Sequence, residues 1–265
     1  MDLTNKVVWV TGASSGIGEA ICYELVKYSC KIVLSSRREE ELLRVKKAMN
    51  LADENVLVLP IDLEKCDLAN DWARQIIEKF GRIDVLINNG GISQKSFADE
   101  TTEEVERKVM EINYFGNVAI AKAVIPYMKK QQSGKIVVTT SILGKFGLPF
   151  HSTYAASKHA LYGFYDSYRL EIKKDNIGVL LVAPGFINTN VAVNSITGDG
   201  SQLNEDSPAQ INGMKTPVFA KKLIKAIKND RKHIYIGKKE LLSIPFKTML
   251  PNLFYSIMLK LSKGK

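Results

Sequence analysis

Tyr154 and Lys158 lie four residues apart, in Tyr-Ala-Ala-Ser-Lys, which places a phenol and an ammonium on one face of a helix. A tyrosine with an unperturbed pKa of about 10 is a poor acid–base catalyst at neutral pH. A neighbouring cation stabilises the phenolate and lowers that pKa toward the working range. The spacing therefore fits proton transfer. The same spacing is common on ordinary helix surfaces, so the pair gains meaning only from further residues.

A second group of residues has the composition of an anion site. Thr11-Gly-Ala-Ser-Ser-Gly-Ile-Gly18 joins an apolar run at 7–10 to a helical pattern over Glu19–Tyr28. Glycines let the backbone approach a ligand closely, and a helix N-terminus offers unpaired N–H groups to an anion. Gly12, Gly16 and Gly18 are spaced one residue wider than the commonest dinucleotide fingerprint, so the motif alone only suggests pyrophosphate binding.

The same turn also fits a serine hydrolase. Gly12 to Gly16 matches Gly-x-Ser-x-Gly, the nucleophile elbow, with Ser14 as the nucleophile. Only one apolar run precedes the motif, which leaves no room for the upstream loop that completes an oxyanion hole. Gly18 has no role in an elbow. The hydrolase is therefore an alternative that the rest of the chain must decide.

The elements that position these residues alternate regularly along the chain. Apolar runs suited to buried strands recur with helical patterns between them, at 7–10, 31–35, 56–60, 83–87, 135–140, 178–183 and 233–236. This alternation predicts an α/β fold with a doubly wound, mostly parallel sheet covered by helices on both faces. We find no repeat, low-complexity tract or linker, so we expect a single domain over residues 1–265.

Further polar and glycine residues follow the ends of the predicted strands. Ser141 closes the run 136–140, the turn 88–91 reads Asn-Asn-Gly-Gly, and Pro184-Gly185 ends the run 178–183. Ligands in open parallel sheets bind at the carboxyl ends of the strands. We therefore expect these residues to meet Tyr154 and the glycine turn at one edge of the sheet.

Composition limits the other possibilities. The 265 residues are 45% hydrophobic, enough for a full core, and the three cysteines have neither metal-ligand spacing nor a disulfide framework. Met1 is followed by Asp2 and a strand rather than a basic and apolar leader, so we expect no secretory signal and a cytoplasmic location. The net charge of +9 is spread over scattered lysine pairs, which favours attraction of anionic cofactors over nucleic-acid binding.

Together these motifs resemble the short-chain dehydrogenase/reductase family over nearly the whole chain. This chain has counterparts, in the same order, to six patterns of the family: Thr-Gly-x-x-x-Gly-x-Gly, Asn-Asn-Ala-Gly, a helix asparagine, a serine, Tyr-x-x-x-Lys and Pro-Gly-x-x-x-Thr. These are Thr11–Gly18, Asn88–Gly91 with Gly90 at the alanine, Asn113, Ser141, Tyr154 with Lys158, and Pro184, Gly185 with Thr189. The resemblance implies a Rossmann-like fold and hydride transfer between a nicotinamide cofactor and a carbonyl or alcohol, with assembly into a homodimer or homotetramer.

The resemblance also implies a role for each residue. Tyr154 would donate or accept the proton, Lys158 would lower the pKa of Tyr154 and bind the nicotinamide ribose, Ser141 would orient the substrate oxygen, and Asn113 would hold a water. Asp62 and Leu63 would contact adenine, and Ile187 and Thr189 the carboxamide. The other cofactor-binding residues expected are Gly12, Ser14, Ser15, Gly16, Ile17, Gly18, Asn89, Gly90, Pro184 and Gly185.

The family pattern weakens the alternatives. It needs no nucleophile, and His151, His159 and His233 have no place in it, although His151 is close enough to Tyr154 in sequence to line a substrate pocket. A nucleotide-binding module without turnover is the second alternative. The intact set of Asn113, Ser141, Tyr154 and Lys158 argues against such a module.

The end of the second strand bears on the cofactor. An acidic residue about 20 positions beyond the glycines holds the ribose 2′-OH of NAD, whereas arginine accommodates the 2′-phosphate of NADP. Here the run 31–35 ends in Ser36-Arg37-Arg38, with no carboxylate. We therefore favour NADP(H), bound by Arg37 and Arg38 with Ser14 as a further contact. The alternative is that both arginines pair with the glutamates at 39–41.

Two segments remain outside these motifs. Residues 186–216 are polar and weakly periodic, so we expect a substrate-binding loop. Residues 241–265 form an apolar tail, and its prolines and lysines argue against a spanning helix. The tail either covers the core or a subunit interface, or it contacts a membrane surface through 241–261 with Phe246, Leu253, Phe254, Tyr255 and Ile257 inserted.

Overall fold

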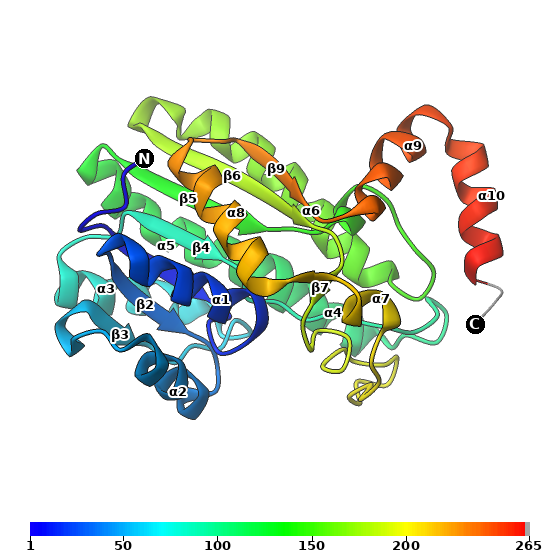
Figure 1. Cartoon of the computed structure of the whole chain (residues 1–265), viewed down its shortest axis with the longest axis horizontal. Helices are drawn as coiled ribbons and strands as arrows, with labels where there is room; N and C mark the ends of the chain where they lie inside the picture. The colour runs from blue at the N-terminus through cyan, green and yellow to red at the C-terminus, as the bar shows by residue number, and fades with distance from the viewer. Residues whose placement is uncertain (263–265) are drawn as a thin grey trace.

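The computed structural model describes residues 1–262 and the side chains of residues 1–260. A seven-stranded parallel sheet forms its centre, in the order β3-β2-β1-β4-β5-β6-β9 (Figure 1). The strands are β1 (Val7–Thr11), β2 (Lys31–Ser35), β3 (Val56–Val58), β4 (Val85–Asn88), β5 (Gly134–Thr139), β6 (Ile177–Pro184) and β9 (His233–Ile236). The strand order reverses between β1 and β4, which is where such sheets form a ligand crevice. The predicted fold is confirmed.

Helices cover both faces of the sheet (Figure 1). One face carries α1 (Gly16–Leu25), α2 (Glu39–Met49) and α8 (Thr216–Lys228), and the other α3 (Ala69–Phe80), α5 (Gly116–Gln131) and α6 (Ser152–Glu171). Alternate residues of each strand divide between the two cores: Val8 and Val10 pack with α1, whereas Val7 and Trp9 pack with α3. The continuous apolar runs in the sequence thus come from strands buried on both faces.

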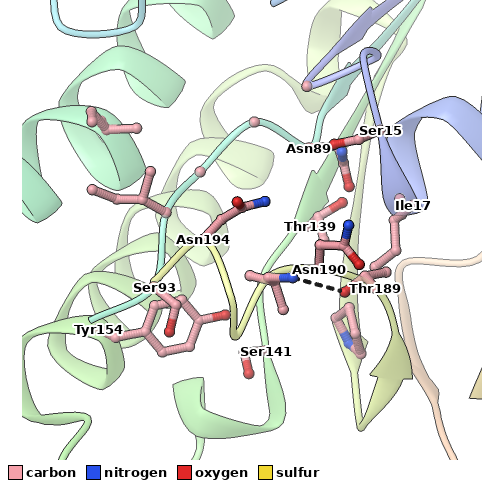
Figure 2. Close-up of a pocket in the computed structure, with 18 of the residues that line it drawn as sticks. Ser15, Ile17, Asn89, Ser93, Thr139, Ser141, Tyr154, Thr189, Asn190 and Asn194 are labelled. Carbon is pink, nitrogen blue, oxygen red and sulfur yellow. Dashed lines mark hydrogen bonds between the residues drawn. The ribbon is translucent and has the colours of Figure 1, made fainter. Parts of the chain in front are cut away.

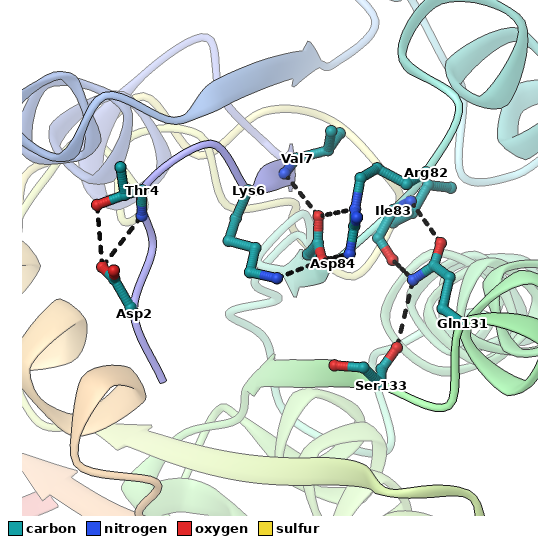
Figure 3. Close-up of polar contacts among 9 residues, drawn as sticks. All are labelled: Asp2, Thr4, Lys6, Val7, Arg82, Ile83, Asp84, Gln131 and Ser133. Atoms are coloured by element: carbon teal, nitrogen blue, oxygen red, sulfur yellow. Dashed lines mark hydrogen bonds and ion pairs between the residues drawn. The ribbon is translucent and has the colours of Figure 1, made fainter.

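The amino ends of β1 and β4 are fixed by a buried carboxylate, Asp84 (Figure 3). Asp84 accepts a hydrogen bond from the Val7 N–H at 3.0 Å and pairs with Arg82 and Lys6. Burial opposes ionisation of Asp84, but the hydrogen bonds from Arg82 and Val7 outweigh it and hold its pKa below the usual value. This ion cluster lies at the edge of the sheet opposite the predicted site, so its role is structural.

The remaining elements lie beyond the carboxyl ends of the strands. They are α4 (Glu103–Met110), β7 (Ile187–Asn188), α7 (Pro208–Ile211), β8 (Met214–Lys215), α9 (Ser243–Met249) and α10 (Pro251–Ser262). The predicted loop 186–216 therefore contains short ordered elements, and β7 pairs with β8 across its base. Pro251 starts α10, a position where the missing N–H of proline has no consequence. Over residues 1–262, we find no helix with the length and apolar content needed to cross a bilayer.

Candidate active site

A cleft of about 600 Å³ opens at the carboxyl ends of β1, β4, β5 and β6. Figure 2 places Ser15, Ile17 and Asn89 at one end and Ser93, Ser141 and Tyr154 at the other. Of the predicted site residues, all but Asn113 and Gly18 line this cleft. Those that line it are Gly12, Ser14, Ser15, Gly16, Ile17, Arg37, Arg38, Asp62, Leu63, Asn89, Gly90, Ser141, Tyr154, Lys158, Pro184, Gly185, Ile187 and Thr189.

The glycine turn at one end is shaped by close main-chain contacts. Gly12 has φ +65°, and a Cβ there would lie 2.9 Å from Cα of Gly90. The Thr11 hydroxyl accepts hydrogen bonds of 3.0 Å from the N–H groups of Asn89 and Gly90, which joins the turns after β1 and β4. Helix α1 begins at Gly16, and the preceding Ser15 makes no side-chain cap. The first N–H groups of α1 thus face the cleft without a capping side chain, as an anion site requires.

Gly18 packs tightly on the glycine turn. It does not line the cleft, and a Cβ there would overlap the carbonyl oxygen of Gly12. Its lack of a side chain lets α1 pack directly against the turn. A cofactor contact at Gly18 stays a prediction.

Tyr154, Ser141 and Lys158 meet at the other end of the cleft (Figure 2). Ser141 follows β5 by two residues and starts a 3₁₀ turn, where its Oγ accepts a hydrogen bond of 3.1 Å from the Leu143 N–H. That leaves the Ser141 O–H proton free to donate. Lys158 is 5% exposed, donates from Nζ to the Thr139 carbonyl oxygen at 3.1 Å, and lies 5.6 Å from the Tyr154 ring centre.

Burial controls the acid–base properties of this pair. It raises the pKa of Tyr154, and a hydrogen bond with Ser141 opposes the rise only in part. It lowers the pKa of Lys158 to about 8. The expected lowering of the Tyr154 pKa by Lys158 is thus not found in this structure, where burial is the largest influence on that pKa and Lys158 Nζ donates to the Thr139 carbonyl oxygen.

Asn113 is fully buried behind the cleft, on a π-helical turn over Glu111–Phe115 that joins α4 to α5. Its amide oxygen accepts from the Ile92 N–H at 2.8 Å, and its nitrogen donates to the Ile92 carbonyl at 2.9 Å and to Ser157 Oγ at 3.1 Å. A Cβ on Gly91 would lie 2.9 Å from Asn113 Oδ1 and 3.6 Å from Lys158 Nζ. Asn113 therefore fixes the chain after β4 close to the ammonium group of Lys158.

The end of β2 carries the groups expected to bind a 2′-phosphate. Arg37 and Arg38 line the cleft, and neither forms an ion pair with another described residue. Glu41 is bound instead by Arg44, which also pairs with Glu19 at 2.8 Å. The alternative pairing with the glutamates at 39–41 is thus not formed. The Ser36 Oγ is buried and, among described atoms, has no hydrogen-bond partner. These groups fit an anion.

The cleft as a whole fits a dinucleotide. Its backbone cradle at Gly12 and Gly90 has no room for a Cβ, and the buried hydroxyls of Ser36 and Thr139 have no described protein partner. Asp62 and Leu63 also line the cleft, and their contact with adenine stays a prediction. Unpaired buried hydroxyls are uncommon unless a ligand or water satisfies them.

A pair of residues beyond β9 holds the loop that closes the substrate end, and the sequence reading missed both. Glu240 accepts hydrogen bonds of 2.9 Å from the N–H groups of Phe186 and Lys238. The Lys238 ammonium donates to the carbonyl oxygens of Asn212 and Gly213, at 2.8 and 3.1 Å. Both ends of the segment 186–213 are thus fixed by two nearly adjacent side chains. No motif marks such residues, since their partners are main-chain groups far away in sequence.

The substrate end has other lining residues that the motifs did not identify. They come mostly from 190–210 and from the chain after β4: Ile92, Ser93, Asn190, Val191, Asn194, Ile196, Gln202 and Gln210. Asn194 and Ser93 point into the cavity near Tyr154 in Figure 2. His151 also lines it, which agrees with its suggested place in a substrate pocket. A weakly periodic loop gives no signal for which of its polar residues face inward.

Ser14 is not set up as a hydrolase nucleophile. The Ser14 carbonyl oxygen accepts a hydrogen bond from Arg44, and Ser14 as a whole is only 7% exposed. His159 binds the Ala155 carbonyl and His233 binds the Tyr162 hydroxyl, both far from the turn in sequence. The groups adjoining Ser14 are backbone and arginine rather than a base.

Known proteins resemble this chain in sequence and in fold. A family model described as short chain dehydrogenase matches residues 6–199. The human dehydrogenase/reductase SDR family member 7 is 39% identical over 250 residues, which span 92% of this chain and 74% of that protein.

Among solved structures, a short chain dehydrogenase/reductase from Burkholderia phymatum in complex with NAD superposes with a TM-score of 0.85 and 22% identity, covering 96% of each chain. An alcohol dehydrogenase from the archaeon Thermococcus sibiricus, complexed with 5-hydroxy-NADP, has a TM-score of 0.76 and 23% identity over 88% of this chain and 97% of that one.

Proposed function

This chain belongs to the short-chain dehydrogenase/reductase family of oxidoreductases, and on that premise we propose that it transfers a hydride between NADP(H) and a carbonyl or alcohol substrate. The observation that carries the proposal is the meeting of Tyr154, Ser141 and Lys158 at one end of a cleft whose other end is the glycine turn. A nicotinamide cofactor supplies or takes the hydride when it is bound. The chain's own residues position the reactants and move the proton.

Tyr154 is the proton donor in the direction of reduction. Its phenolic proton passes to the substrate oxygen as the carbonyl becomes an alcohol, and the reverse reaction returns it. Ser141 is free to donate its own proton in a hydrogen bond to that oxygen, because its Oγ already accepts from the Leu143 N–H. Lys158 Nζ donates to the Thr139 carbonyl oxygen and lies 5.6 Å from the Tyr154 ring centre. We propose that its ammonium turns toward the Tyr154 oxygen during the reaction and there stabilises the phenolate that remains.

NADP(H) is the cofactor that the end of β2 favours. A carboxylate there would repel a 2′-phosphate, and the chain has Ser36, Arg37 and Arg38 instead. Both arginines lack an ion-pair partner among described residues, and the Ser36 hydroxyl lacks a hydrogen-bond partner. The two solved relatives contain NAD and an NADP derivative respectively, so family membership alone leaves the choice to these residues.

The activity is tested by following NADPH oxidation against ketones, aldehydes, steroids and acyl thioesters. We expect turnover with at least one class, and a loss of about a thousandfold or more in Tyr154→Phe with NADPH affinity changed less than severalfold. Tyr162→Phe, on the same helix but outside the cleft lining, is the control. Retained turnover in Tyr154→Phe would contradict the mechanism, and NADPH binding without any turnover would favour a binding module.

The cofactor preference is tested by the dissociation constants of NADPH and NADH. We expect the wild-type chain to prefer NADPH, and Arg37→Ala to weaken NADPH by about tenfold or more while NADH changes little. Arg74→Ala, on the surface of α3, is the control. Equal losses for both cofactors would rule out a 2′-phosphate contact.

Three expectations stay predictions: that residues 186–216 form a substrate loop, that the chain assembles into a homodimer or homotetramer, and that it has a cytoplasmic location. The loop carries much of the lining at the substrate end, so we propose that it selects among carbonyl classes.

A further inference from the structure

Exposed apolar side chains are concentrated at the carboxyl end of the chain. Elsewhere among the described residues, the exposed large hydrophobic side chains are spread along the sequence from Leu43 to Tyr235. Six exposed large hydrophobic side chains lie close together in sequence, within residues 242–259. We call this set the tail face: Leu242, Met249, Leu250, Leu253, Tyr255 and Leu259. Concentrated apolar exposure of this kind marks an interaction surface.

The tail is nevertheless docked on the rest of the protein. Phe254 is fully buried and packs edge to face on Phe146 and Phe246, with ring centres 5.2 and 5.9 Å apart. The expectation that Phe254 inserts into a membrane is therefore wrong, since this ring belongs to the protein's own core. In Figure 1, α9 and α10 project outward beyond β9, with α10 farthest from the sheet. Phe254 is thus buried in the protein, whereas the exposed residues of the tail combine the apolar side chains of the tail face with polar ones such as Ser256 and Lys260.

The charge of the tail indicates what covers it. Residues 241–265 contain four lysines and no aspartate or glutamate, in a chain of net charge +9. Lys247 and Lys260 form no ion pair with another described residue. Glu240, the nearest carboxylate in sequence, is turned inward onto the Phe186 N–H. A second copy of the chain would bring one cationic tail against another, whereas an anionic lipid surface complements both the lysines and the apolar side chains.

We propose that the tail face binds the surface of membranes that contain anionic lipids. The seven residues of α9 and the twelve of α10, separated by Leu250 alone, suit a segment that lies in the interfacial plane. The apolar side chains enter the boundary between headgroups and acyl chains, and the lysines contact the phosphates. The tail packs on Ile142, Leu143 and Phe146, just after Ser141, so a bound membrane adjoins the substrate end of the cleft.

The test is flotation of the full-length protein with vesicles of phosphatidylcholine alone and of phosphatidylcholine with phosphatidylserine. We expect binding to the anionic vesicles and much weaker binding to the neutral ones. Met249→Ser/Leu253→Ser, at positions 76% and 51% exposed, should weaken binding by about tenfold or more without disturbing the fold. Lys247→Gln/Lys260→Gln should weaken it by about fivefold per lysine and reduce the preference for phosphatidylserine.

The matched control is Leu43→Ser/Leu170→Ser, which removes two leucines that are 48% and 73% exposed elsewhere on the surface. This variant should bind vesicles as the wild type does. Failure of the wild type to float with anionic vesicles would overturn the proposal, as would an equal loss in the control. A lipid-free dimer that Met249→Ser/Leu253→Ser dissociates, without vesicle binding, would assign the face to a second copy. Vesicle binding is measured without cofactor or substrate, so its outcome is independent of the proposed reaction.

Discussion

The two ends of the cleft are held in shape by different means. At the glycine end, main-chain groups pack directly on one another, with Gly12 against Gly90 and Gly18 against the Gly12 carbonyl. At the substrate end, loops are fixed by side chains that arrive from the far end of the chain. Glu240 and Lys238 hold the two ends of 186–213, and Phe254 packs on the segment after Ser141.

The difference has a consequence for how each end tolerates change. A contact between main-chain groups leaves no space for a Cβ, so only glycine fits and the requirement is absolute. A contact made by a side chain can be replaced by any group of similar reach and hydrogen-bonding capacity. The glycine end should therefore fail by steric overlap, whereas the substrate end should loosen gradually.

The largest expected effect is that of Gly18→Ala. Its Cβ would overlap the Gly12 carbonyl oxygen, and main chain cannot move aside as a side chain can. We expect a loss of about 3 kcal/mol in the free energy of unfolding, measured by urea denaturation. Gly163→Ala, on α6 with no atom within 4 Å of the added methyl group, is the matched control and should gain up to about 1 kcal/mol. An unchanged free energy of unfolding in Gly18→Ala would contradict the claim that main-chain packing at the glycine end permits only glycine.

Lys158→Met probes the buried charge at the substrate end, which is held by a side chain rather than by main-chain packing. Burial lowers the pKa of Lys158 from 10.5 to about 8, so the unfolded chain binds more protons between these values and the stability of the wild type rises with pH there. Below pH 8, burying the ammonium group of Lys158 lowers the free energy of unfolding by roughly 3 kcal/mol. Methionine removes this destabilisation, but it also loses the hydrogen bond to the Thr139 carbonyl, which contributes about 1 kcal/mol.

Lys158→Met should therefore be more stable than the wild type by about 2 kcal/mol at pH 7, although inactive, and the gain should vanish as the pH rises toward 10. Urea denaturation at both pH values measures the difference. A gain that is the same at pH 7 and pH 10 would mean that the buried charge is not its source.

Glu240→Ala should have the smallest effect on stability and a selective effect on the substrate end. It releases the Phe186 N–H, and we expect kcat/KM to fall by about tenfold and protease cleavage within 186–213 to accelerate, with the melting temperature changed by a few degrees at most. Glu240→Gln keeps an oxygen that accepts the same two hydrogen bonds, so it should recover most of the activity. If the glutamine variant is as impaired as the alanine variant, the positioning role is incorrect.

The same difference explains what the sequence could predict. Gly12, Gly16 and the residues at the ends of β4, β5 and β6 occupy positions where backbone geometry permits few residue types, and their order along the chain predicts both the fold and the cleft lining. Ser141 follows β5 and lines the cleft for that reason, whereas Lys158 lines it because helical spacing keeps it on the side of α6 that carries Tyr154. Glu240, Lys238, Ser93 and Asn194 could not be predicted, because pairing with distant main-chain groups or facing inward from a loop leaves no periodic signal.

The direction of the Tyr154 pKa shift differs from the sequence-based expectation for a physical reason. Helical spacing places Lys158 on the same side of α6 as Tyr154, but it does not give the degree of burial or the direction of the Lys158 side chain. Those depend on β5 and on the chain after β4. A local pattern can thus identify a proton-transfer pair without giving the energies of its protonation states.

The π-helical turn at Glu111–Phe115 changes the rotational alignment of α4 relative to α5. Each residue of an α-helix advances the side-chain direction by about 100°. Deleting one residue from this turn would restore regular geometry, but it would rotate α4 relative to α5 by about that angle. Either Asn113 would lose its hydrogen bond from the Ile92 N–H, or the side chains of Val105 and Val109 would leave the protein interior. The irregular turn lets one continuous helical segment keep two different angular alignments, one for the protein interior and one for the active site.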